Sequence, residues 1–242
     1  MDYTIVIPVH NEAEHIVPFV EGFLTRLPSE VTGLLREIIL VENGSRDISL
    51  AACQGLETMH PDLIRTISLP RGSYGEAIKT GILAVQGSHL SILECDFLDE
   101  QFVAASVGMF SASKSRFIVA SKRHPDSRDN RPWKRRLLTE GFNRILNMLF
   151  GYPGSDTHGL KSIETTLAKR LCELAQTTDE VLQTELVLMA WKKGIRIDEL
   201  PIRIEERRVT PVSIVRRVPM VLDLLSQLRD SLRRFDENKV KI

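Results

Sequence analysis

The sequence predicts an α/β fold built on a mostly parallel sheet. Two observations carry this prediction: short β-branched runs alternate with longer amphipathic stretches over the first 120 residues, and the composition is that of a globular protein. Hydrophobic residues make up 43% and charged residues 26% of the chain, which excludes a disordered protein and a multi-spanning membrane protein. The 242 residues fit one α/β domain with a modest extension.

The alternating elements of the first half are the basis of the sheet prediction. The short apolar runs are typical of buried strands and cover residues 4–9, 37–41, 65–68, 88–93 and 117–120. The stretches between them carry apolar residues at spacings of three and four, as helices packed on a sheet do; they cover 12–27, 49–60, 74–85 and 101–111. Strands that alternate with helices predict a parallel sheet flanked by helices.

The second half departs from this alternation. A polar loop leads into a long amphipathic stretch at 133–150, and a Gly-rich turn at 151–159 precedes two more helical stretches. Residues 195–204 return as a strand whose Pro201 suits a sheet edge. We expect one domain over residues 1–214 and a C-terminal amphipathic helical extension over 215–242.

Charge and cysteine content narrow the partners and the compartment. Basic and acidic residues both number 32, so no net charge favours nucleic acid. Three cysteines without Cys-x-x-Cys spacing indicate neither a disulfide framework nor a zinc site, and they fit a reducing compartment. No signal peptide and no bilayer-spanning apolar run is visible. We therefore expect a cytoplasmic protein, either soluble or peripheral at the inner face of a membrane.

Polar residues follow the predicted strands, where ligands of open α/β sheets bind. After the first strand, Pro8, His10 and Glu12 place a ring and a carboxylate where a base or ribose could rest, although a plain turn capped by Asn11 is the alternative. The loop after the second strand begins with Glu42 and turns tightly. Residues 71–77 open a helix whose N-terminus suits a phosphate, and a plain turn fits this loop equally well.

The strongest local signal is an acidic cluster, in which a buried strand ends in four acidic residues within positions 94–100. Isolated carboxylates are costly to bury. Alternate residues of a strand share a face, so Glu94 and Asp96 can direct two carboxylates at one Mg²⁺ or Mn²⁺ that also binds a diphosphate. The alternative is a solvated strand end with Asp99 as a helix cap.

These motifs, in this order, resemble the family 2 glycosyltransferases of the GT-A fold, and particularly the dolichyl-phosphate mannose and glucose synthases. The resemblance covers roughly residues 3–214. The matching segments are 8–12 with Pro-x-Tyr-Asn-Glu, 41–47 with Val-Asp-Asp-Gly-Ser-x-Asp, 94–96 with Asp-x-Asp, 120–123 with Gly-Ser-Arg, 156–161 with Asp-x-x-x-Gly-Phe-Arg, and 199–202 with Glu-Leu-Pro.

The resemblance implies a GT-A sandwich that moves a sugar from a nucleoside-diphosphate donor by metal-assisted, inverting displacement. It implies a metal held by Asp96 with help from Glu94, with Asp99 as a further oxygen ligand. Asp96 and Asp156 are the implied catalytic residues, Asp156 as the general base for a hydroxyl acceptor. His158, beside Asp156, is a candidate for a role in catalysis or in acceptor contact. The implied donor-binding residues are Pro8, His10, Glu12, Glu42, Glu94, Cys95, Asp96, Lys122, Arg123 and Arg208.

Several positions depart from the family pattern and leave the sugar and the acceptor open. His10 replaces Tyr, Glu42-Asn43 replaces Asp-Asp, Glu94 replaces Asp, and Leu98 replaces a metal-side Gln. A catalytically weak protein that binds nucleotide sugars is therefore an alternative to an enzyme. A nucleotidyltransferase is disfavoured, since residues 8–12 contain no Gly-rich triphosphate loop.

Two basic amphipathic stretches favour a polyprenyl phosphate acceptor at a membrane surface over a soluble hydroxyl acceptor. One is 133–150, which opens with Trp133 and three basic residues, and the other follows Val218 and ends near Phe235. The alternative is that each stretch packs on the domain or on a second subunit, and the near-heptad spacing of the last stretch suggests a homodimer seam.

Overall fold

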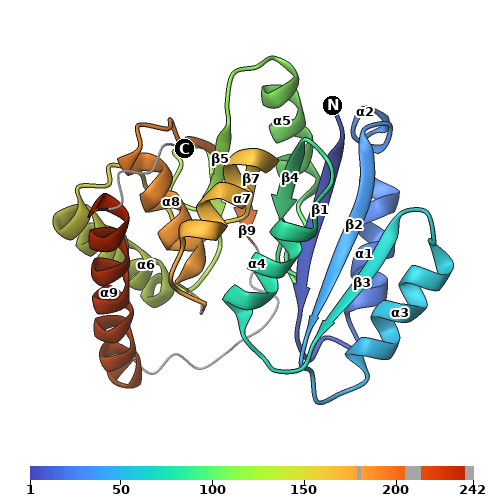
Figure 1. Ribbon diagram of the computed structural model, residues 1–242, viewed down its shortest axis with the longest axis horizontal. Coiled ribbons are helices and arrows are strands. Elements are labelled where there is room, and N and C mark those ends of the chain that lie inside the picture. The colour runs from blue at the N-terminus through green and yellow to red at the C-terminus, as the bar shows by residue number, and fades with distance from the viewer. Residues whose placement is uncertain (179–180, 205–213, 238–242) are drawn as a thin grey trace.

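A seven-stranded sheet forms the centre of the protein, in the order β3-β2-β1-β4-β7-β5-β8 (Figure 1). The computed structural model describes residues 1–178, 181–204 and 214–237. The strands of the sheet are β1 (Tyr3–Val9), β2 (Leu35–Asn43), β3 (Ile64–Leu69), β4 (His89–Ile92), β5 (Phe117–Ser121), β7 (Lys161–Glu164) and β8 (Asp198–Pro201). Only the pairs that β7 makes with β4 and β5 are antiparallel, so the prediction of a mostly parallel sheet is confirmed.

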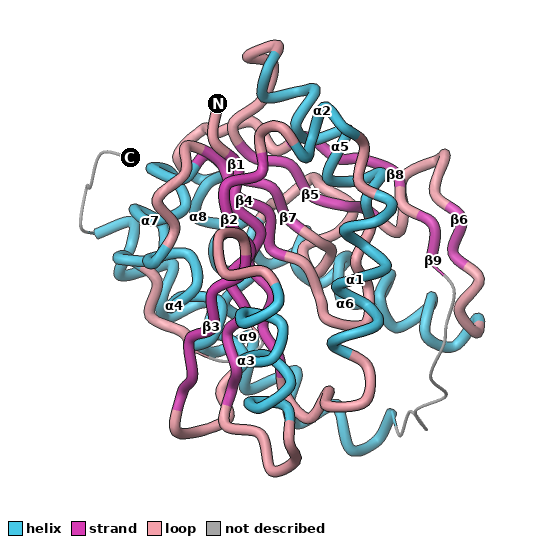
Figure 2. Tube along the Cα trace, turned by 90° about the vertical axis from the view of Figure 1, so that its right-hand side faces the viewer, coloured by secondary structure: helices cyan, strands magenta, loops and turns pink. Residues whose placement is uncertain are grey.

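Helices cover both faces of this sheet (Figure 2). One face packs against α4 (Tyr74–Ala84), α7 (Thr165–Leu174) and α8 (Leu182–Lys192). The other packs against α1 (Ile16–Arg26), α3 (Ser49–Met59) and α5 (Glu100–Ser111). Alternate residues of β1 divide between the two cores, because successive side chains of a strand point to opposite faces: Val6 lies in the first core, and Ile5 and Ile7 lie in the second.

The remaining elements lie at the margins of the sheet. They are the short helix α2 (Ser29–Thr32), the two-stranded pair of β6 (Arg128–Asp129) with β9 (Arg203–Ile204), and the long helices α6 (Trp133–Phe150) and α9 (Ile214–Glu237). Pro201 ends β8 at the edge of the sheet, as predicted. Among the described helices, none combines the length and apolar content needed to cross a bilayer.

Strand β7 lies inside the sheet between β4 and β5, and the sequence did not predict it. Its residues are mostly polar, yet Lys161 and Ser162 are fully buried. Ser162 Oγ lies 2.6 Å from Ser91 Oγ and accepts a hydrogen bond from the Tyr3 hydroxyl at 3.1 Å. These side-chain hydrogen bonds satisfy the polar groups inside the sheet. These hydrogen bonds join residues far apart in sequence, so no local sequence pattern predicts them.

Helix α9 packs on the domain along its described part. Leu225, Leu228, Leu232 and Phe235 are buried in the same hydrophobic core as α8. For these residues the packing alternative applies, because the domain itself covers their apolar face. The side chains of residues 214–222, which include Val218, lie outside the described part.

Candidate functional site

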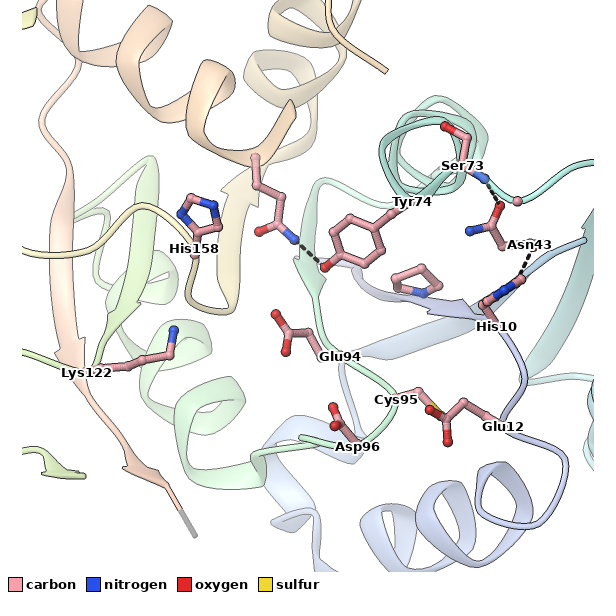
Figure 3. A pocket seen from close by; sticks show the side chains of 13 residues that line it. His10, Glu12, Asn43, Ser73, Tyr74, Glu94, Cys95, Asp96, Lys122 and His158 are labelled. Carbon is pink, nitrogen blue, oxygen red and sulfur yellow. Dashed lines mark hydrogen bonds between the residues drawn. The ribbon is translucent and has the colours of Figure 1, made fainter. Parts of the chain in front are cut away.

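A cavity of about 610 Å³ opens at the carboxyl ends of β1, β2 and β4 (Figure 3), a size typical of small-molecule sites. It brings together seven residues that the resemblance implied. These are Pro8, His10, Glu12, Glu94, Cys95, Asp96 and Lys122. The lining also contains Asn43, Gly72, Ser73, Tyr74, His158 and Gln183. Glu42, Arg123, Asp99 and Asp156 are not part of this lining, and Arg208 lies outside the described residues.

His10 works as a clasp between two loops at one end of the cavity. Its Nδ1 lies 2.7 Å from the Asn43 carbonyl, which can only accept, so Nδ1 carries the proton. Asn11 Oδ1 accepts the Arg46 N–H at 2.9 Å, which fixes the Asn11 amide and directs its Nδ2 at His10 Nε2, also at 2.9 Å. Both ring nitrogens are therefore engaged in hydrogen bonds. Asn11 has a positive φ of 54° and does not cap α1, which begins at Ile16.

Asn43, rather than Glu42, borders this end of the cavity. Glu42 is buried and accepts hydrogen bonds from Ser45 N at 2.6 Å and Ser68 Oγ at 2.8 Å. Asn43 is the next residue of β2, so its side chain leaves the opposite face; its Oδ1 accepts the Ser73 N–H at 2.7 Å. The expectation that Glu42 contacts the nucleotide is therefore not supported by its position: it shapes the loop that presents Asn43.

The acidic cluster divides between two roles. Glu94 and Asp96 both face the cavity (Figure 3). Burial raises the pKa of Glu94, and the nearby Lys122 opposes this shift. Asp99 caps α5 instead: its Oδ1 accepts the Phe102 N–H at 2.8 Å, so the helix-cap alternative describes its geometry. Asp99 does not line the cavity that Glu94 and Asp96 face.

The Glu94–Asp96 pair fits a divalent cation that substrate oxygens also ligate. No group of three or more His, Cys, Asp or Glu side chains that could hold a metal occurs among the residues whose placement the structure gives. Mg²⁺ sites at diphosphates commonly use one or two carboxylates plus phosphate oxygens and water. Two carboxylates at the cavity wall match that donor set, with the remaining ligands supplied by a bound diphosphate.

The other end of the cavity carries the cationic Lys122. Its Nζ lies 3.3 Å from Asp156 Oδ2, and the Asp156 side chain is only 1% exposed. Burial alone would raise the pKa of Asp156, but the Lys122 charge and the N–H groups of His158 and Lys122 outweigh burial, so this pKa lies below its ordinary value. Asp156 therefore anchors Lys122 and does not reach the cavity.

His158 and Gln183 complete this end of the cavity. Desolvation, followed by the charges of Lys161 and Lys122, lowers the pKa of His158, so its ring is neutral at physiological pH. Gln183 donates to the Tyr74 hydroxyl at 2.6 Å, and its Oε1 accepts a hydrogen bond from the buried Lys161 Nζ. Gln183 was not predicted, because it lies on α8, 109 residues from Tyr74, with no motif around it.

Arg123 faces away from the cavity. Its guanidinium pairs with Glu140 of α6 at 3.3 Å. Of the adjacent cations Lys122 and Arg123, which the resemblance placed at the diphosphate, the structure therefore brings only Lys122 to the cavity.

Comparisons with known proteins point to one family. The family described as glycosyl transferase family 2 matches residues 4–163. A dolichyl-phosphate beta-glucosyltransferase of Trichomonas vaginalis is 24% identical over 234 residues, covering 92% of this chain and 69% of the relative. A dolichyl-phosphate beta-glucosyltransferase of Saccharomyces cerevisiae is 24% identical over 221 residues, covering 82% of this chain and 65% of the relative.

A solved structure shows the same fold. Glucosyl-3-phosphoglycerate synthase from Mycobacterium tuberculosis, crystallised with Mn²⁺, uridine-diphosphate-glucose and phosphoglyceric acid, superposes with a TM-score of 0.69 at 18% identity. The match covers 95% of this chain and 79% of that one. The family match over most of the chain, with a GT-A sandwich whose strand ends carry the matching residues, shows that this protein belongs to glycosyltransferase family 2 and is a glycosyltransferase.

Proposed function

We propose that this protein transfers a hexose from a nucleoside-diphosphate sugar to a lipid-linked phosphate, with inversion at the anomeric carbon. One observation carries the donor half of the proposal: a single cavity places the His10–Asn43 clasp at one end, the Glu94–Asp96 pair in the middle and Lys122 at the other end (Figure 3). This order matches a base, a diphosphate with its cation, and the bond that breaks between the diphosphate and the sugar.

Each part of the cavity has a distinct task in this proposal. The His10 ring and Pro8 offer apolar surface to the base, and Glu12 adds a carboxylate for the ribose. Glu94 and Asp96 hold Mg²⁺ or Mn²⁺, which would supply Lewis-acid stabilisation of the departing nucleoside diphosphate. Lys122 contributes a positive charge near the bond that breaks, where developing negative charge is stabilised.

The acceptor half of the proposal rests on the contacts of Asp156 and on the names of the curated relatives. The names of the curated relatives specify dolichyl phosphate as acceptor. A phosphate monoester with a second pKa near ~6 is already ionised at neutral pH and needs no general base. The cavity fits such an acceptor because Asp156, the candidate base for a hydroxyl, is outside its lining and engaged by Lys122.

Helix α6 offers the surface on which such an acceptor would arrive. Four of its apolar side chains face solvent: Trp133 is 67% exposed, Leu137 58%, Met148 83% and Leu149 60%. Arg136 and Arg144 are exposed on the same helix. Exposed apolar and basic groups together fit the interface of an anionic membrane. By contrast, the described apolar face of α9 is covered by the domain, so α6 is the better of the two predicted membrane helices.

Direct contacts connect α6 to the Lys122 end of the cavity. The Phe142 ring meets the His158 ring edge-on, with centroids 5.1 Å apart. Glu140 pairs with Arg123, the residue after Lys122. A lipid phosphate whose chains rest against the outer face of α6 would therefore meet the end of the cavity that is farthest from the His10 clasp.

The donor assignment is tested by titrating UDP and GDP calorimetrically, with and without Mn²⁺. We expect Mn²⁺ to strengthen binding by the wild-type protein and not by Asp96→Asn. Asp99→Asn is the matched control, because Asn also caps helices and the substitution removes a carboxylate nearby; it should keep the Mn²⁺ effect. An Asp96→Asn variant that keeps the full Mn²⁺ effect would place the cation elsewhere. Slow metal-dependent release of nucleoside diphosphate from the sugar donor distinguishes an enzyme from a binding protein.

The membrane assignment is tested by flotation with anionic liposomes at low and high salt. We expect the wild-type protein to float at low salt and to be released at high salt, and Trp133→Ser with Leu137→Ser to remain in the soluble fraction. Ile48→Ser is the control, because Ile48 is 74% exposed beside α3. A wild-type protein that stays soluble and transfers sugar to a soluble hydroxyl acceptor would overturn the lipid-phosphate proposal, and a dimer that buries α6 would reassign this face.

A further inference from the structure

Glu185 is a fully buried carboxylate that joins three segments of the chain. It lies on α8, and its oxygens accept hydrogen bonds from Gln176 N at 2.9 Å and Thr177 N at 3.0 Å. The Thr177 hydroxyl and the Ser231 hydroxyl of α9 donate to the same carboxylate. A buried carboxylate requires such donors, since each missing partner leaves charge uncompensated. Glu185 therefore ties α9 to the segment just before α8.

That segment in turn holds a wall of the cavity. The Thr178 carbonyl accepts the Ser73 hydroxyl at 2.6 Å, and the Ser73 N–H donates to Asn43 Oδ1 at 2.7 Å. From α8 itself, Gln183 donates to the Tyr74 hydroxyl at 2.6 Å. Ser73 and Tyr74 are adjacent residues of the cavity wall (Figure 3). They are thus held from the α8 side at two separate points.

We propose that Glu185 is a positioning residue through which α9 sets the nucleotide-binding wall of the cavity. Seating of α9 supplies the Ser231 hydroxyl, the carboxylate holds residues 176–177 in place, and Thr178 then fixes Ser73 beside Asn43. The C-terminal helix thereby raises the affinity for the nucleoside diphosphate through the contacts of Glu185. The inference rests on the proposed function, because it takes the Asn43 end of the cavity as the nucleotide end.

The contacts that run from Ser231 through Glu185 and residues 176–178 to Ser73 form a relay. A second contact between α8 and α9 makes it possible to distinguish the effect of this relay from that of ordinary helix packing. Lys192 Nζ of α8 pairs with Asp236 Oδ2 of α9 at 2.5 Å. This pair joins the same two helices at the C-terminal end of α8, whereas Glu185 lies near the N-terminal end of that helix. Loss of the pair loosens α9 without removing a donor from Glu185. Loss of the Ser231 hydroxyl removes that donor directly.

The test compares Ser231→Ala with Asp236→Asn in the full chain, measuring calorimetric affinity for UDP and GDP with Mn²⁺ and the midpoint of thermal unfolding. We expect Ser231→Ala to weaken nucleotide binding about fivefold or more, at the low end of typical site-to-site couplings. Asp236→Asn should change the affinity by about twofold or less, which is below the range of such couplings. In transfer assays, Ser231→Ala should raise the donor KM and leave kcat unchanged, and Ser231→Thr, which keeps the hydroxyl, should restore the affinity.

Two further results decide the matter. If Ser231→Ala does not fold, Thr177→Val removes a donor from the loop side of the same carboxylate and should weaken the affinity similarly. In a double-mutant cycle, Ser73→Ala removes the hydroxyl that donates to Thr178. In that background, Ser231→Ala should have little additional effect on the nucleotide affinity. Equal affinity losses in Ser231→Ala and Asp236→Asn, or fully additive losses with Ser73→Ala, would overturn the relay while leaving the proposed function intact. A wild-type protein that binds no nucleoside diphosphate would overturn both.

Discussion

Replacing Asp156 with Asn separates two roles for this carboxylate, the anchor of Lys122 and the general base. Asp156 accepts the His158 N–H at 2.9 Å, the Lys122 N–H at 3.2 Å and the Lys122 ammonium at 3.3 Å. Asn has nearly the same shape and keeps one accepting oxygen. The substitution therefore removes the charge of the anchor with little change in packing.

The structure sets the size of the expected effect. Hydrogen bonds to charged groups contribute about 1.5–3 kcal/mol each. Lys122 is 18% exposed at the cavity and can be solvated when released, so the full penalty of a broken buried pair does not apply. We expect the free energy of unfolding to fall by about 2 kcal/mol. A released Lys122 should also weaken nucleoside-diphosphate binding about tenfold, which corresponds to about 1.4 kcal/mol.

The stability loss should depend on pH. The folded pKa of Asp156 lies below its ordinary value of 3.8, so the ionised carboxylate stabilises the fold above that pH. This contribution is lost as the pH falls through the folded pKa. The stability difference between wild type and Asp156→Asn should therefore be constant near neutral pH and narrow below pH 3.8.

Urea unfolding, nucleotide calorimetry and single-turnover transfer measure these effects. Asp129→Asn is the matched control, because Asp129 pairs with Arg131 at 2.8 Å away from the cavity lining; it should lose stability and keep nucleotide affinity. A general base predicts the opposite pattern, a fall in kcat of about 10²- to 10⁴-fold with stability and affinity unchanged. That pattern in Asp156→Asn would refute the anchoring role and favour a hydroxyl acceptor.

Three further predictions concern the cavity and the core. The double variant His10→Ala, Glu12→Gln should remain folded by circular dichroism and bind UDP and GDP more weakly in calorimetry; unchanged affinity would place the nucleotide elsewhere. Gly44→Ala should cost about 1–3 kcal/mol in urea unfolding, because Gly44 has a φ of +59° and an added Cβ would lie 2.6 Å from the Arg71 carbonyl carbon; a wild-type unfolding curve would contradict this. Burial lowers the pKa of Lys161 from 10.5 to about 7, so between these pH values the unfolded chain binds more protons than the folded chain. The Lys161 contribution should therefore make the free energy of unfolding rise with pH over this range, and the rise should be smaller in Lys161→Met. Equal pH slopes in the two proteins would show that Lys161 titrates normally.

The sequence by itself determined the α/β class and predicted several of the residues that line the cavity. Alternating strands and helices specify a parallel sheet through their periodicity, a property of each segment alone. In such a sheet the residues after neighbouring strands meet at one edge. This rule brought Pro8, His10 and Glu12 of one loop to the same cavity as Glu94 and Asp96 of another before any contact between them was known.

Only the tertiary structure decided which polar side chains face the cavity. Adjacent residues of a strand point to opposite faces, and the packing of β2 turned Asn43 inward and Glu42 toward Ser68. The capping role of Asp99 likewise depended on where α5 begins. A motif names a pair of positions, but the orientation of each residue on its strand selects which of the two side chains faces the cavity.

The structure also decided what covers each amphipathic helix. The sequences of α6 and α9 both show an apolar face beside basic residues, yet α9 buries Leu228 and Leu232 against the domain while α6 exposes Trp133 and Met148. Gln183 and Tyr74 meet across 109 residues in the same way, without a local signal. The periodicity of a sequence predicts that one face of a helix is apolar, because this periodicity depends only on neighbours along that helix. What lies against that face depends on contacts distant in sequence, which only the folded chain creates.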